Sequence, residues 1–459
     1  MALKFGTDGV RGVANAELTP ELVLALGRAA ARVLGGPTGA FLIGRDTRAS
    51  GPLLQSALAA GLASEGLEVR DLGVLPTPGV AAVSTAYGMP AAMISASHNP
   101  FSDNGIKLFG AGGRKLTDDT EKRLEQELAA VLGESQGAPA SRLGGPAVLP
   151  PTGAAVGRVV LDREAVEWYE RQLVASLEGR SLRGIRVAID CANGSATGTA
   201  SDVLRQAGAD VVATLFAEPD GCNINDGCGS TDPGALQAVV TSTKADVGLA
   251  FDGDADRVIA VDHNGQLVDG DHLLALFAID MKARGRLASD TVVVTVMTNL
   301  GFRLGMQERG ISVRETQVGD RYVLEALDEG GLSLGGEQSG HIIFRDLATT
   351  GDGVLTGIQL LDLVSRQGKP LAELTDEAMV RLPQVLRNVP VADRDSLASA
   401  ETVWAEVAHL EAALAGRGRV LLRPSGTEPL VRIMVEAPTE AEADSTAEKL
   451  AEVVTRALG

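Results

Sequence analysis

The chain of 459 residues is too long for one hydrophobic core, and its length alone predicts about three domains. Hydrophobic residues make up 45% and charged residues 22%, as in ordinary globular proteins, but aromatic residues are only 3%. The formal net charge is -19, so phosphate backbones and anionic lipid surfaces would repel the chain. We therefore expect neither a nucleic acid nor a membrane as its partner.

The sequence favours a cytoplasmic location. Its first residues, MALKFGTDGVRG, lack the apolar core of a signal peptide, and no stretch reaches the length of a membrane span. Cys191, Cys222 and Cys228 lack the spacing of a metal site and cannot all pair. Reduced thiols of this kind are typical of cytoplasmic proteins.

Three segments share one order of predicted elements, at residues 39–73, 184–216 and 291–316. Each begins with a short apolar strand and a polar loop, followed by a helix and a second strand. Strand–helix–strand units with continuously apolar strands indicate buried sheets that are flanked by helices. They predict three α/β domains of related design.

The boundaries between the predicted domains follow from changes in composition. Segment 133–156 is rich in Gly, Pro and Ala and reads as a linker or surface excursion that closes the first domain. Near the C-terminus, GRVLLRPSGTEPLVRIMVEA forms two strands around a turn between two helix-like segments, which is typical of a small α+β domain. The predicted domains are 1–155, 156–258, 259–370 and 371–459.

Ser97 and His98 stand side by side at the end of an apolar stretch, in ISASHNP. A serine nucleophile and its base must face each other, whereas neighbours in an extended loop point in opposite directions. The stretch also lacks the G-x-S-x-G turn of α/β hydrolases. We therefore reject a serine-hydrolase dyad. A polar turn explains these residues but leaves Lys107, just behind them, without a role.

Asp252, Asp254 and Asp256 alternate in FDGDADRV. In an extended loop their carboxylates fall on one side, where they repel one another unless a hard cation lies between them. The spacing resembles the start of a calcium loop, but Arg257 stands where that loop needs glycine and His263 where it needs glutamate. An EF-hand is rejected, and a solvated acidic turn remains the alternative. Because an apolar strand delivers the loop to a sheet edge, we predict a metal site, with Mg²⁺ preferred for phosphate chemistry.

The segment RPSGTEP, which begins at Arg423, lies between the two predicted strands of the last domain. Ser425, Gly426 and Thr427 can present hydroxyl and backbone N–H groups in a concave turn that binds anions. Arg423 and Arg432, on the flanking strands, can add forked hydrogen bonds to phosphate oxygens. S-G-T alone is common in turns, but the two arginines favour a phosphate site.

Two glycine-rich segments are further candidates. In GGEQSGH, Glu337 and Ser339 are two residues apart, so both side chains can point to one side and hold neighbouring hydroxyls. A hairpin turn is the alternative there. FGTDGVRG places Arg11 in a glycine-rich loop, which alone is equally well an ordinary turn. Together with the serine, the aspartates and the anion-binding turn, these segments predict a phosphosugar site where several domains meet.

The motifs ISASHNP, FDGDADR, GGEQSGH and RPSGTEP, in this order and spacing, resemble the alpha-D-phosphohexomutase superfamily. The resemblance covers essentially the whole chain. FGTDGVRG, the segment PDGCNINDGCGST at 219–231 and Gln338 resemble the subgroup that acts on glucosamine phosphates. The stretch after Gly133 is the least similar to the superfamily.

The resemblance implies an α/β fold of four domains around a central cleft, three of related topology with mixed sheets and a smaller α+β C-terminal domain. It implies that Ser97 carries a phosphoryl group and that a phosphoserine oxygen and the three aspartates hold Mg²⁺. The other implied site residues are Arg11, Lys107 and His341 near the transferring group, Glu337, Ser339 and Arg257 at the sugar, and Arg423, Ser425, Gly426, Thr427 and Arg432 at the substrate phosphate.

The implied activity interconverts glucosamine 6-phosphate and glucosamine 1-phosphate through a 1,6-bisphosphate, and feeds UDP-N-acetylglucosamine and cell-wall precursor synthesis. A hexose 1,6-bisphosphate is the implied activating donor. Lys107 or His341 is the candidate base, and His98 is a turn or support residue. We also expect the partner to be a small phosphosugar, with a homodimer as one oligomeric state.

Three alternatives remain from the sequence. A phosphomannomutase or phosphoglucomutase has the same mechanism and a different sugar. An aspartyl-phosphate phosphatase would use Asp252 as nucleophile and Asp254 as acid, but leaves Ser97 and RPSGTEP without a role. A non-catalytic protein that binds sugar phosphate or calcium would show no turnover.

Overall fold

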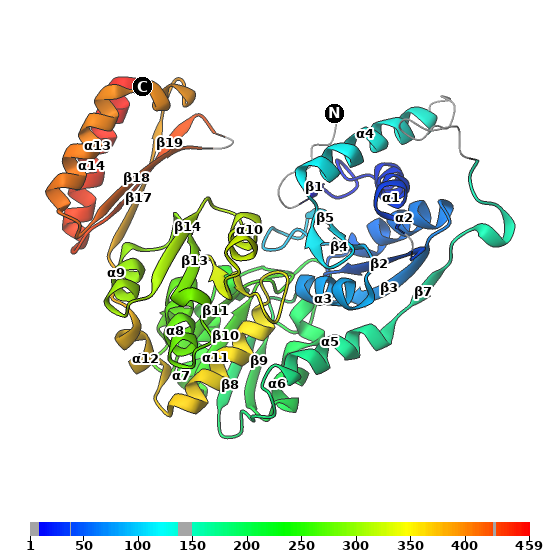
Figure 1. Ribbon diagram of the computed structural model, residues 1–459, viewed down its shortest axis with the longest axis horizontal. Coiled ribbons are helices and arrows are strands. Elements are labelled where there is room, and N and C mark those ends of the chain that lie inside the picture. The colour runs from blue at the N-terminus through cyan, green and yellow to red at the C-terminus, as the bar shows by residue number, and fades with distance from the viewer. Residues whose placement is uncertain (1–8, 37, 136–148, 426–427) are drawn as a thin grey trace. The chain divides into compact units, whose positions relative to one another are not determined.

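The computed structural model describes residues 9–36, 38–135, 149–425 and 428–459 (Figure 1). The chain forms two compact units, which we call the large unit and the small unit. The large unit contains Met1–Val296 and Arg314–Thr375, and the small unit contains Met297–Val313 and Asp376–Gly459.

The first sheet of the large unit has the strand order β1-β5-β4-β2-β3-β7, with β6 beside β5. Strands β2, β3, β4 and β7 are parallel, whereas β5 runs antiparallel to β4 and β1. Helices α1, α2 and α4 share one buried cluster with this sheet. The elements are β1 (Val10–Val13), α1 (Pro20–Leu34), β2 (Ala40–Arg45), α2 (Gly51–Ser64), β3 (Glu68–Val74), α3 (Thr77–Tyr87), β4 (Ala91–Ile94), β5 (Asp103–Gly110), β6 (Arg114–Lys115), α4 (Asp118–Ser135), η1 (Gly153–Ala155) and β7 (Val159–Leu161).

The second sheet has the order β12-β11-β10-β8-β9. Its strands β8, β9 and β10 are parallel, and β11 and β12 are antiparallel additions at one edge. Every residue of β10 is buried, as expected for a parallel strand that is covered on both faces. The elements are α5 (Arg163–Ala175), β8 (Arg186–Asp190), η2 (Ser195–Gly198), α6 (Ala200–Gln206), β9 (Asp210–Leu215), η3 (Gly229–Thr231), α7 (Gly234–Thr243), β10 (Val247–Phe251), β11 (Val258–Asp262) and β12 (Leu267–Val268).

The third sheet has the order β14-β13-β15-β16, with β13 and β15 parallel and β16 antiparallel to β15. Side-chain caps begin several of its helices; Asp269 Oδ1, for example, accepts from the N–H of His272 at 3.2 Å. The elements are α8 (Gly270–Ala283), η4 (Ala288–Asp290), β13 (Thr291–Thr295), α9 (Leu300–Glu308), β14 (Ser312–Thr316), α10 (Asp320–Gly330), β15 (Leu334–Gly336), β16 (Ile342–Phe344), α11 (Gly353–Gln367) and α12 (Leu371–Ala378).

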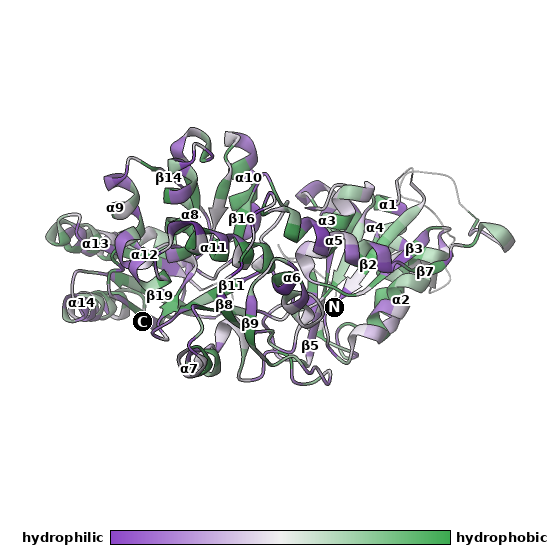
Figure 2. Cartoon of the chain, turned by 90° about the horizontal axis from the view of Figure 1, so that it is seen from below, coloured by the Kyte–Doolittle hydropathy of each residue, from purple (hydrophilic) through white to green (hydrophobic). Residues whose placement is uncertain are grey.

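The small unit contains an antiparallel sheet of order β17-β19-β18. One face of this sheet and the two long helices α13 and α14 form a single hydrophobic core. The helices of the molecule carry hydrophobic and hydrophilic residues on the same ribbon, as Figure 2 shows for α14. The elements are β17 (Gln384–Pro390), η5 (Asp395–Ser399), α13 (Glu401–Leu414), β18 (Arg419–Pro424), β19 (Leu430–Glu436) and α14 (Glu440–Leu458).

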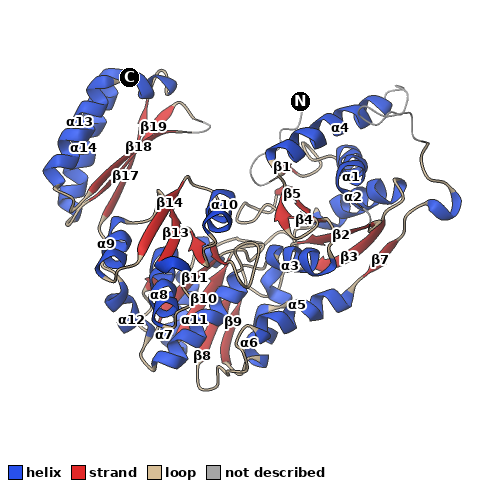
Figure 3. Cartoon of the chain, in the orientation of Figure 1, coloured by secondary structure: helices blue, strands red, loops and turns tan. Residues whose placement is uncertain are grey.

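The predicted strand–helix–strand units are confirmed as β2–α2–β3, β8–α6–β9 and β13–α9–β14 (Figure 3). The mixed α/β class and the smaller α+β C-terminal part are likewise confirmed. Strand β17, which completes the last sheet, has no counterpart among the predicted elements. The domain limits 1–155, 156–258, 259–370 and 371–459 remain predictions.

Candidate active site

Ser97 lies in the loop that follows strand β4, and its backbone conformation is unusual for serine. Its φ of 52° lies in the left-handed region, which residues other than glycine adopt at an energetic cost. The Ser97 N–H donates to Ser95 Oγ at 2.9 Å, and Ser95 Oγ donates in turn to Asp46 Oδ2 at 2.6 Å. Because the side chain is only 2% exposed, this loop fixes the direction of Ser97 Oγ.

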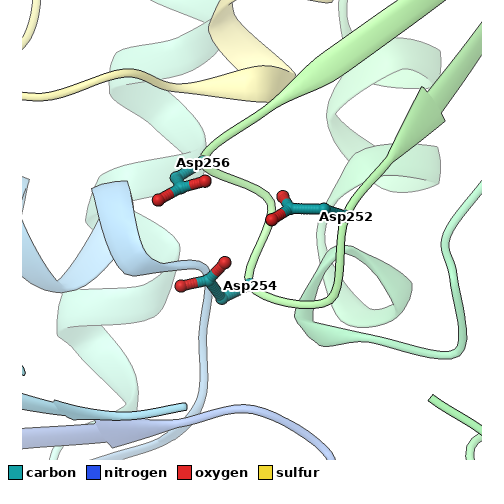
Figure 4. Close-up of side chains that lie close together, drawn as sticks. All are labelled: Asp252, Asp254 and Asp256. Atoms are coloured by element: carbon teal, nitrogen blue, oxygen red, sulfur yellow. The ribbon is translucent and has the colours of Figure 1, made fainter. Parts of the chain in front are cut away.

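The Ser97 hydroxyl faces the triple-Asp loop between β10 and β11. Ser97 Oγ donates a 2.6 Å hydrogen bond to Asp252 Oδ2. Figure 4 shows the carboxylates of Asp252, Asp254 and Asp256 directed toward one another from this loop. All three side chains are buried. The fold therefore brings the serine and the three aspartates together, although they belong to two different sheets.

Lys107 supplies positive charge to this acidic cluster. Its Nζ lies 2.7 Å from Asp254 Oδ2 and 3.5 Å from Asp256 Oδ2. Burial raises the pKa of Asp252 well above its usual range, and the nearby charges of Asp256 and Asp254 raise it further. Burial alone would also raise the pKa of Asp256, but Lys107 and His341 outweigh it and hold that pKa well below its usual range. The carboxylates thus differ strongly in their affinity for a proton.

The donor set of this cluster fits a hard divalent cation. One carboxylate oxygen from each aspartate lies within 4.8 Å of the others. The buried Oδ1 atoms of Asp254 and Asp256 accept no hydrogen bond from any residue that the structure describes. Unsatisfied, buried carboxylate oxygens are costly, whereas oxygen ligands of this kind suit Mg²⁺ or Ca²⁺. The predicted metal site is therefore compatible with the geometry.

His341 lies behind Asp256 and is almost fully buried. Its Nδ1 is 3.8 Å from Asp256 Oδ1. Its Nε2 accepts a 3.0 Å hydrogen bond from the N–H of Gly351. Because that lone pair is occupied, the ring is placed to orient Asp256 and is poorly placed to accept a proton from a substrate.

His98 lies between Ser97 and the guanidinium group of Arg257. His98 Nδ1 lies 3.4 Å from Ser97 Oγ and 3.3 Å from Arg257 Nη1. The expectation that Ser97 and His98 point in opposite directions is therefore wrong, because the left-handed φ of Ser97 departs from an extended loop. Burial lowers the pKa of His98, and the charges of Arg257 and Arg11 lower it further. The two guanidinium groups thus place positive charge near His98, the neighbour of Ser97, where a phosphate group would be favoured. Arg257 therefore lies beside the His98 ring next to Ser97, and Arg11 acts on the same ring, whereas the sequence had suggested the sugar for Arg257.

The predicted sugar-binding motif forms the turn between β15 and β16. The Glu337 carboxylate accepts from the N–H of Gly319 at 2.9 Å, and the buried Oγ of Ser339 has no hydrogen-bond partner among the described residues. The N–H of Val258 donates to Gly340 O at 3.1 Å, so the turn lies directly beside the end of the triple-Asp loop. A Cβ at Gly340 would lie 2.1 Å from Val258 O, which explains why the position requires glycine.

The predicted phosphate-binding residues lie in the small unit. Arg423 on β18 and Arg432 on β19 are direct cross-strand partners, and they line a cavity of about 240 Å³ together with Asn388 of β17. Like charges directly opposite each other destabilise a sheet, so an anion between them would be favourable. Ser425 is buried, and its Oγ accepts from the N–H of Glu428 at 3.3 Å. Gly426 and Thr427 lie outside the described residues.

The structure adds Thr77, which the sequence pattern did not single out. Thr77 is the first residue of α3, and its Oγ1 donates to Asp254 Oδ2 at 2.6 Å. Its N–H donates to Asp254 O at 2.9 Å. The sequence signal for Thr77 is weak, since it consists only of a polar residue that follows the apolar end of β3. Asp320, at the start of α10, lies 3.7 Å from His341 Nε2 and was also missed.

The fold and the site define a phosphohexomutase. The chain matches four models of the phosphoglucomutase/phosphomannomutase family: alpha/beta/alpha domain I over residues 2–132, domain II over 169–265, domain III over 269–382 and the C-terminal domain over 386–453. It is 51% identical over 458 residues to the phosphoglucosamine mutase of Desulforudis audaxviator, covering 99% of this chain and 98% of that protein. The chain therefore belongs to the alpha-D-phosphohexomutase superfamily, and within it to the group of the phosphoglucosamine mutases.

Solved structures show the same fold. A phosphoglucomutase/phosphomannomutase family protein from Burkholderia thailandensis has a TM-score of 0.79 at 25% identity, covering 99% of this chain and 97% of that one. The N-acetylphosphoglucosamine mutase of Aspergillus fumigatus, solved in complex with GlcNAc-6P and magnesium, has a TM-score of 0.68 at 19% identity, covering 100% and 96%. A variant of the latter was solved with glucose 1,6-bisphosphate. The family assigns the chain to the mutase enzymes, which are isomerases that act by phosphoryl transfer. Within the described part of the chain, no helix has the length and apolarity needed to cross a membrane.

Proposed function

We propose that the enzyme interconverts glucosamine 6-phosphate and glucosamine 1-phosphate, with Ser97 as the phosphoryl carrier. The observation that carries this proposal is the 2.6 Å hydrogen bond from Ser97 Oγ to Asp252, inside a cluster that fits a divalent cation. The guanidinium group of Arg257, whose Nη1 lies 3.3 Å from the His98 ring beside Ser97, supports a phosphoserine at the same position. The full-length likeness to phosphoglucosamine mutases supports the choice of sugar.

In the proposed reaction, the phosphoryl group of Ser97 moves to the free hydroxyl of the substrate. The bond between phosphorus and Ser97 Oγ breaks, a bond to the sugar oxygen forms, and the proton of the sugar hydroxyl passes to a base. The resulting 1,6-bisphosphate turns around, and Ser97 Oγ recovers a phosphoryl group from the other position. The net change is an isomerisation with ping-pong behaviour.

Mg²⁺ is the proposed cofactor, and Asp252, Asp254 and Asp256 would hold it together with a phosphoserine oxygen. When bound, it would neutralise charge on the phosphoryl oxygens and on the departing serine oxygen. Lys107 holds its ammonium group against Asp254 and Asp256 at the same place. Lys107 and His341 are the two candidate bases: the Nε2 lone pair of His341 already accepts from Gly351, and Lys107 can accept a proton only after its ammonium group has lost one.

The remaining residues are proposed to bind the two ends of the substrate. Glu337 and Ser339 would accept and donate to sugar hydroxyls beside Arg257, since the buried Oγ of Ser339 has no partner among the described residues. The guanidinium groups of Arg423 and Arg432, which are cross-strand partners in the small unit, would bind the phosphate that is not being transferred. The residues proposed for that phosphate are Arg423, Ser425, Gly426, Thr427 and Arg432.

A hexose 1,6-bisphosphate is the proposed activating donor, because an unphosphorylated Ser97 needs a phosphoryl group before the first turnover. We further propose a cytoplasmic enzyme with a small phosphosugar as its partner, and the free cysteines support a reducing environment. A homodimer remains a prediction, which the mass of the native protein in solution would test.

Parallel assays with glucosamine, glucose and mannose 6-phosphates would test the substrate. The proposal predicts the highest kcat/KM for glucosamine 6-phosphate. A clear preference for the mannose compound would instead make the chain a phosphomannomutase, with the same chemistry at Ser97. An acid-labile phosphate on Asp252 would favour the phosphatase alternative.

A further inference from the structure

Three backbone carbonyl groups of the loop at residues 97–100 accept hydrogen bonds from one buried guanidinium. Arg48 is completely buried, and its Nη2 donates to Ser97 O at 2.9 Å and to Asn99 O at 2.8 Å. Its Nη1 donates to Pro100 O, and its Nε donates to the buried Asp46 at 2.9 Å. Such a planar fork holds three peptide groups of one loop in fixed orientations, which a lysine ammonium does less well.

A second side chain reaches the same carbonyl oxygens from the second sheet. Asn225, in the loop after β9, donates from Nδ2 to Ser97 O at 2.9 Å and to Asn99 O at 3.2 Å. This contact requires glycine at position 253, because a Cβ there would lie 2.6 Å from Ser97 O and 2.8 Å from Asn225 Nδ2. The Ser97 carbonyl is therefore held by one donor from each of two sheets.

The two donors are themselves connected through their loops. Thr47, next to Arg48, donates from Oγ1 to Asn193 O at 2.5 Å. Ala49 donates its N–H to Gly221 O, at 2.9 Å, in the loop that carries Asn225. These contacts tie the loop that carries Arg48 to the loop that carries Asn225.

We propose that Arg48 and Asn225 form a clamp that holds the Ser97 loop in its reactive geometry. They are positioning residues: they touch the backbone of the loop, and Ser97 Oγ is aimed at Asp252 as a result. The left-handed φ of Ser97 is costly, and it persists only when surrounding contacts determine it. The inference rests on the proposed function, in which Ser97 carries the phosphoryl group.

The clamp also gives a role to the segment PDGCNINDGCGST, which otherwise marks only a resemblance. Through Asn225, this segment contacts the phosphoryl-carrying loop. We therefore infer that Asn225 supports the phosphoryl-transfer step and does not recognise the sugar. Asn223, two residues earlier, is a matched control because its amide donates to Glu218 O at 3.0 Å, within its own loop and away from the Ser97 loop.

The test compares Asn225→Asp with Asn223→Asp in single-turnover experiments. The purified enzymes are phosphorylated with glucose 1,6-bisphosphate, freed of the donor, and mixed with saturating glucosamine 6-phosphate in a rapid-quench device. A carboxylate at 225 cannot donate and repels two carbonyl oxygens, so we expect the transfer rate constant to fall about 10- to 100-fold, as for a misplaced reacting group. The Asn223→Asp rate constant should stay within about twofold of the unmodified enzyme.

The rate constant of transfer reports on the positioning of Ser97, and the amplitude reports on the amount of folded enzyme. A variant that merely loses folded protein shows a lower amplitude at an unchanged rate constant, and that result would overturn the clamp. Arg48→Lys, whose melting temperature is measured first, should reproduce the slow transfer if it remains folded. An unmodified enzyme that never acquires phosphate on Ser97 would overturn the proposed function, whereas normal transfer by phosphorylated Asn225→Asp would overturn only the clamp.

Discussion

The hydroxyl of Ser97 donates a 2.6 Å hydrogen bond to Asp252, although the two residues are 155 positions apart in the chain. The serine lies in the loop that follows strand β4 of the first sheet, and the aspartate directly follows strand β10 of the second. Their meeting places a potential phosphoryl carrier beside three buried carboxylates that fit a divalent cation. The proposed chemistry depends on this one juxtaposition.

Replacing Ser97 by alanine should remove turnover and spare the fold. The substitution deletes the only atom that carries the phosphoryl group in the proposed reaction, so we expect kcat to fall by at least about 10³-fold, a scale known for lost nucleophiles. Coupled assays of glucosamine 1-phosphate formation measure this loss. Ser102→Ala, at an exposed position of the same loop, is the control and should keep full activity. Undiminished turnover by Ser97→Ala would refute the carrier role.

Asp254→Asn should weaken metal binding. The change removes one of three carboxylate charges, and we expect the half-saturating Mg²⁺ concentration to rise at least about tenfold, since even residues that only orient a ligand cost that much. Calorimetric titration with Mg²⁺ gives a readout that is independent of activity. The exposed Asp226→Asn is the control for a lost surface charge. Unaltered Mg²⁺ affinity would show that Asp254 is not a ligand.

Arg423→Gln should raise KM for the sugar phosphate. A hydrogen bond to a charged group contributes about 1.5–3 kcal/mol, which corresponds to a change of roughly 10- to 100-fold. Steady-state kinetics with glucosamine 6-phosphate measure the shift. Arg387→Gln is the matched control, because Arg387 pairs at 3.1 Å with Asp444 of helix α14 on the other face of the sheet. Equal KM values for both variants would argue against a phosphate site at Arg423.

Asp352 should make stability depend on pH. Tyr169 Oη donates to Asp352 Oδ2 at 2.9 Å, and burial raises the pKa of Asp352 from 3.8 to about 6. The folded state thus keeps a proton that the unfolded chain releases near pH 4, so this contribution to stability decreases as the pH rises to about 6 and is constant above. The free energy of unfolding therefore changes through Asp352 by about 3 kcal/mol, at roughly 1.36 kcal/mol per pKa unit.

Because Asp352→Asn cannot ionise, its melting temperature should rise relative to that of the unmodified enzyme between about pH 4 and pH 6. Differential scanning calorimetry at several pH values measures the difference. The exposed Asp346→Asn should show no such trend. A constant difference between Asp352→Asn and the unmodified enzyme would mean that Asp352 titrates normally.

One of the three cysteines should react quickly in the native protein. Cys222 is exposed, whereas Cys191 and Cys228 are buried, and burial raises the pKa of both buried thiols to about 12. Titration with a thiol reagent near neutral pH should therefore give one fast equivalent, which Cys222→Ser removes. Fast modification of Cys191, located by peptide mapping, would contradict the described core.

Much of the fold follows from local patterns in the sequence. The strand–helix–strand units were predicted because continuous apolar strands and amphipathic helices are read within short windows. The alternation of Asp252, Asp254 and Asp256 similarly indicated a shared face within one loop. Strand β17 was missed because its burial depends on pairing with β19, about 45 residues away, and no local signal records that contact.

The supporting residues of the site were harder to predict than its chemistry. Arg48, Thr77 and Asn225 act through loops that come together only when two sheets pack against each other. In the sequence each resembles an ordinary polar loop residue. The pairing of His341 with Gly351, which makes the histidine a poor base, is likewise a tertiary contact. Sequence motifs therefore identify the reacting side chains, whereas the supporting residues that position them become visible only in the folded structure.

Intact-mass measurement with phosphosite mapping, before and after phosphatase treatment, tests the central claim most directly. We predict a single phosphate on Ser97, whose removal stops turnover until a hexose 1,6-bisphosphate restores it. Phosphate on Asp252, or full activity without any phosphate, would contradict this account and move the chemistry to the triple-Asp loop.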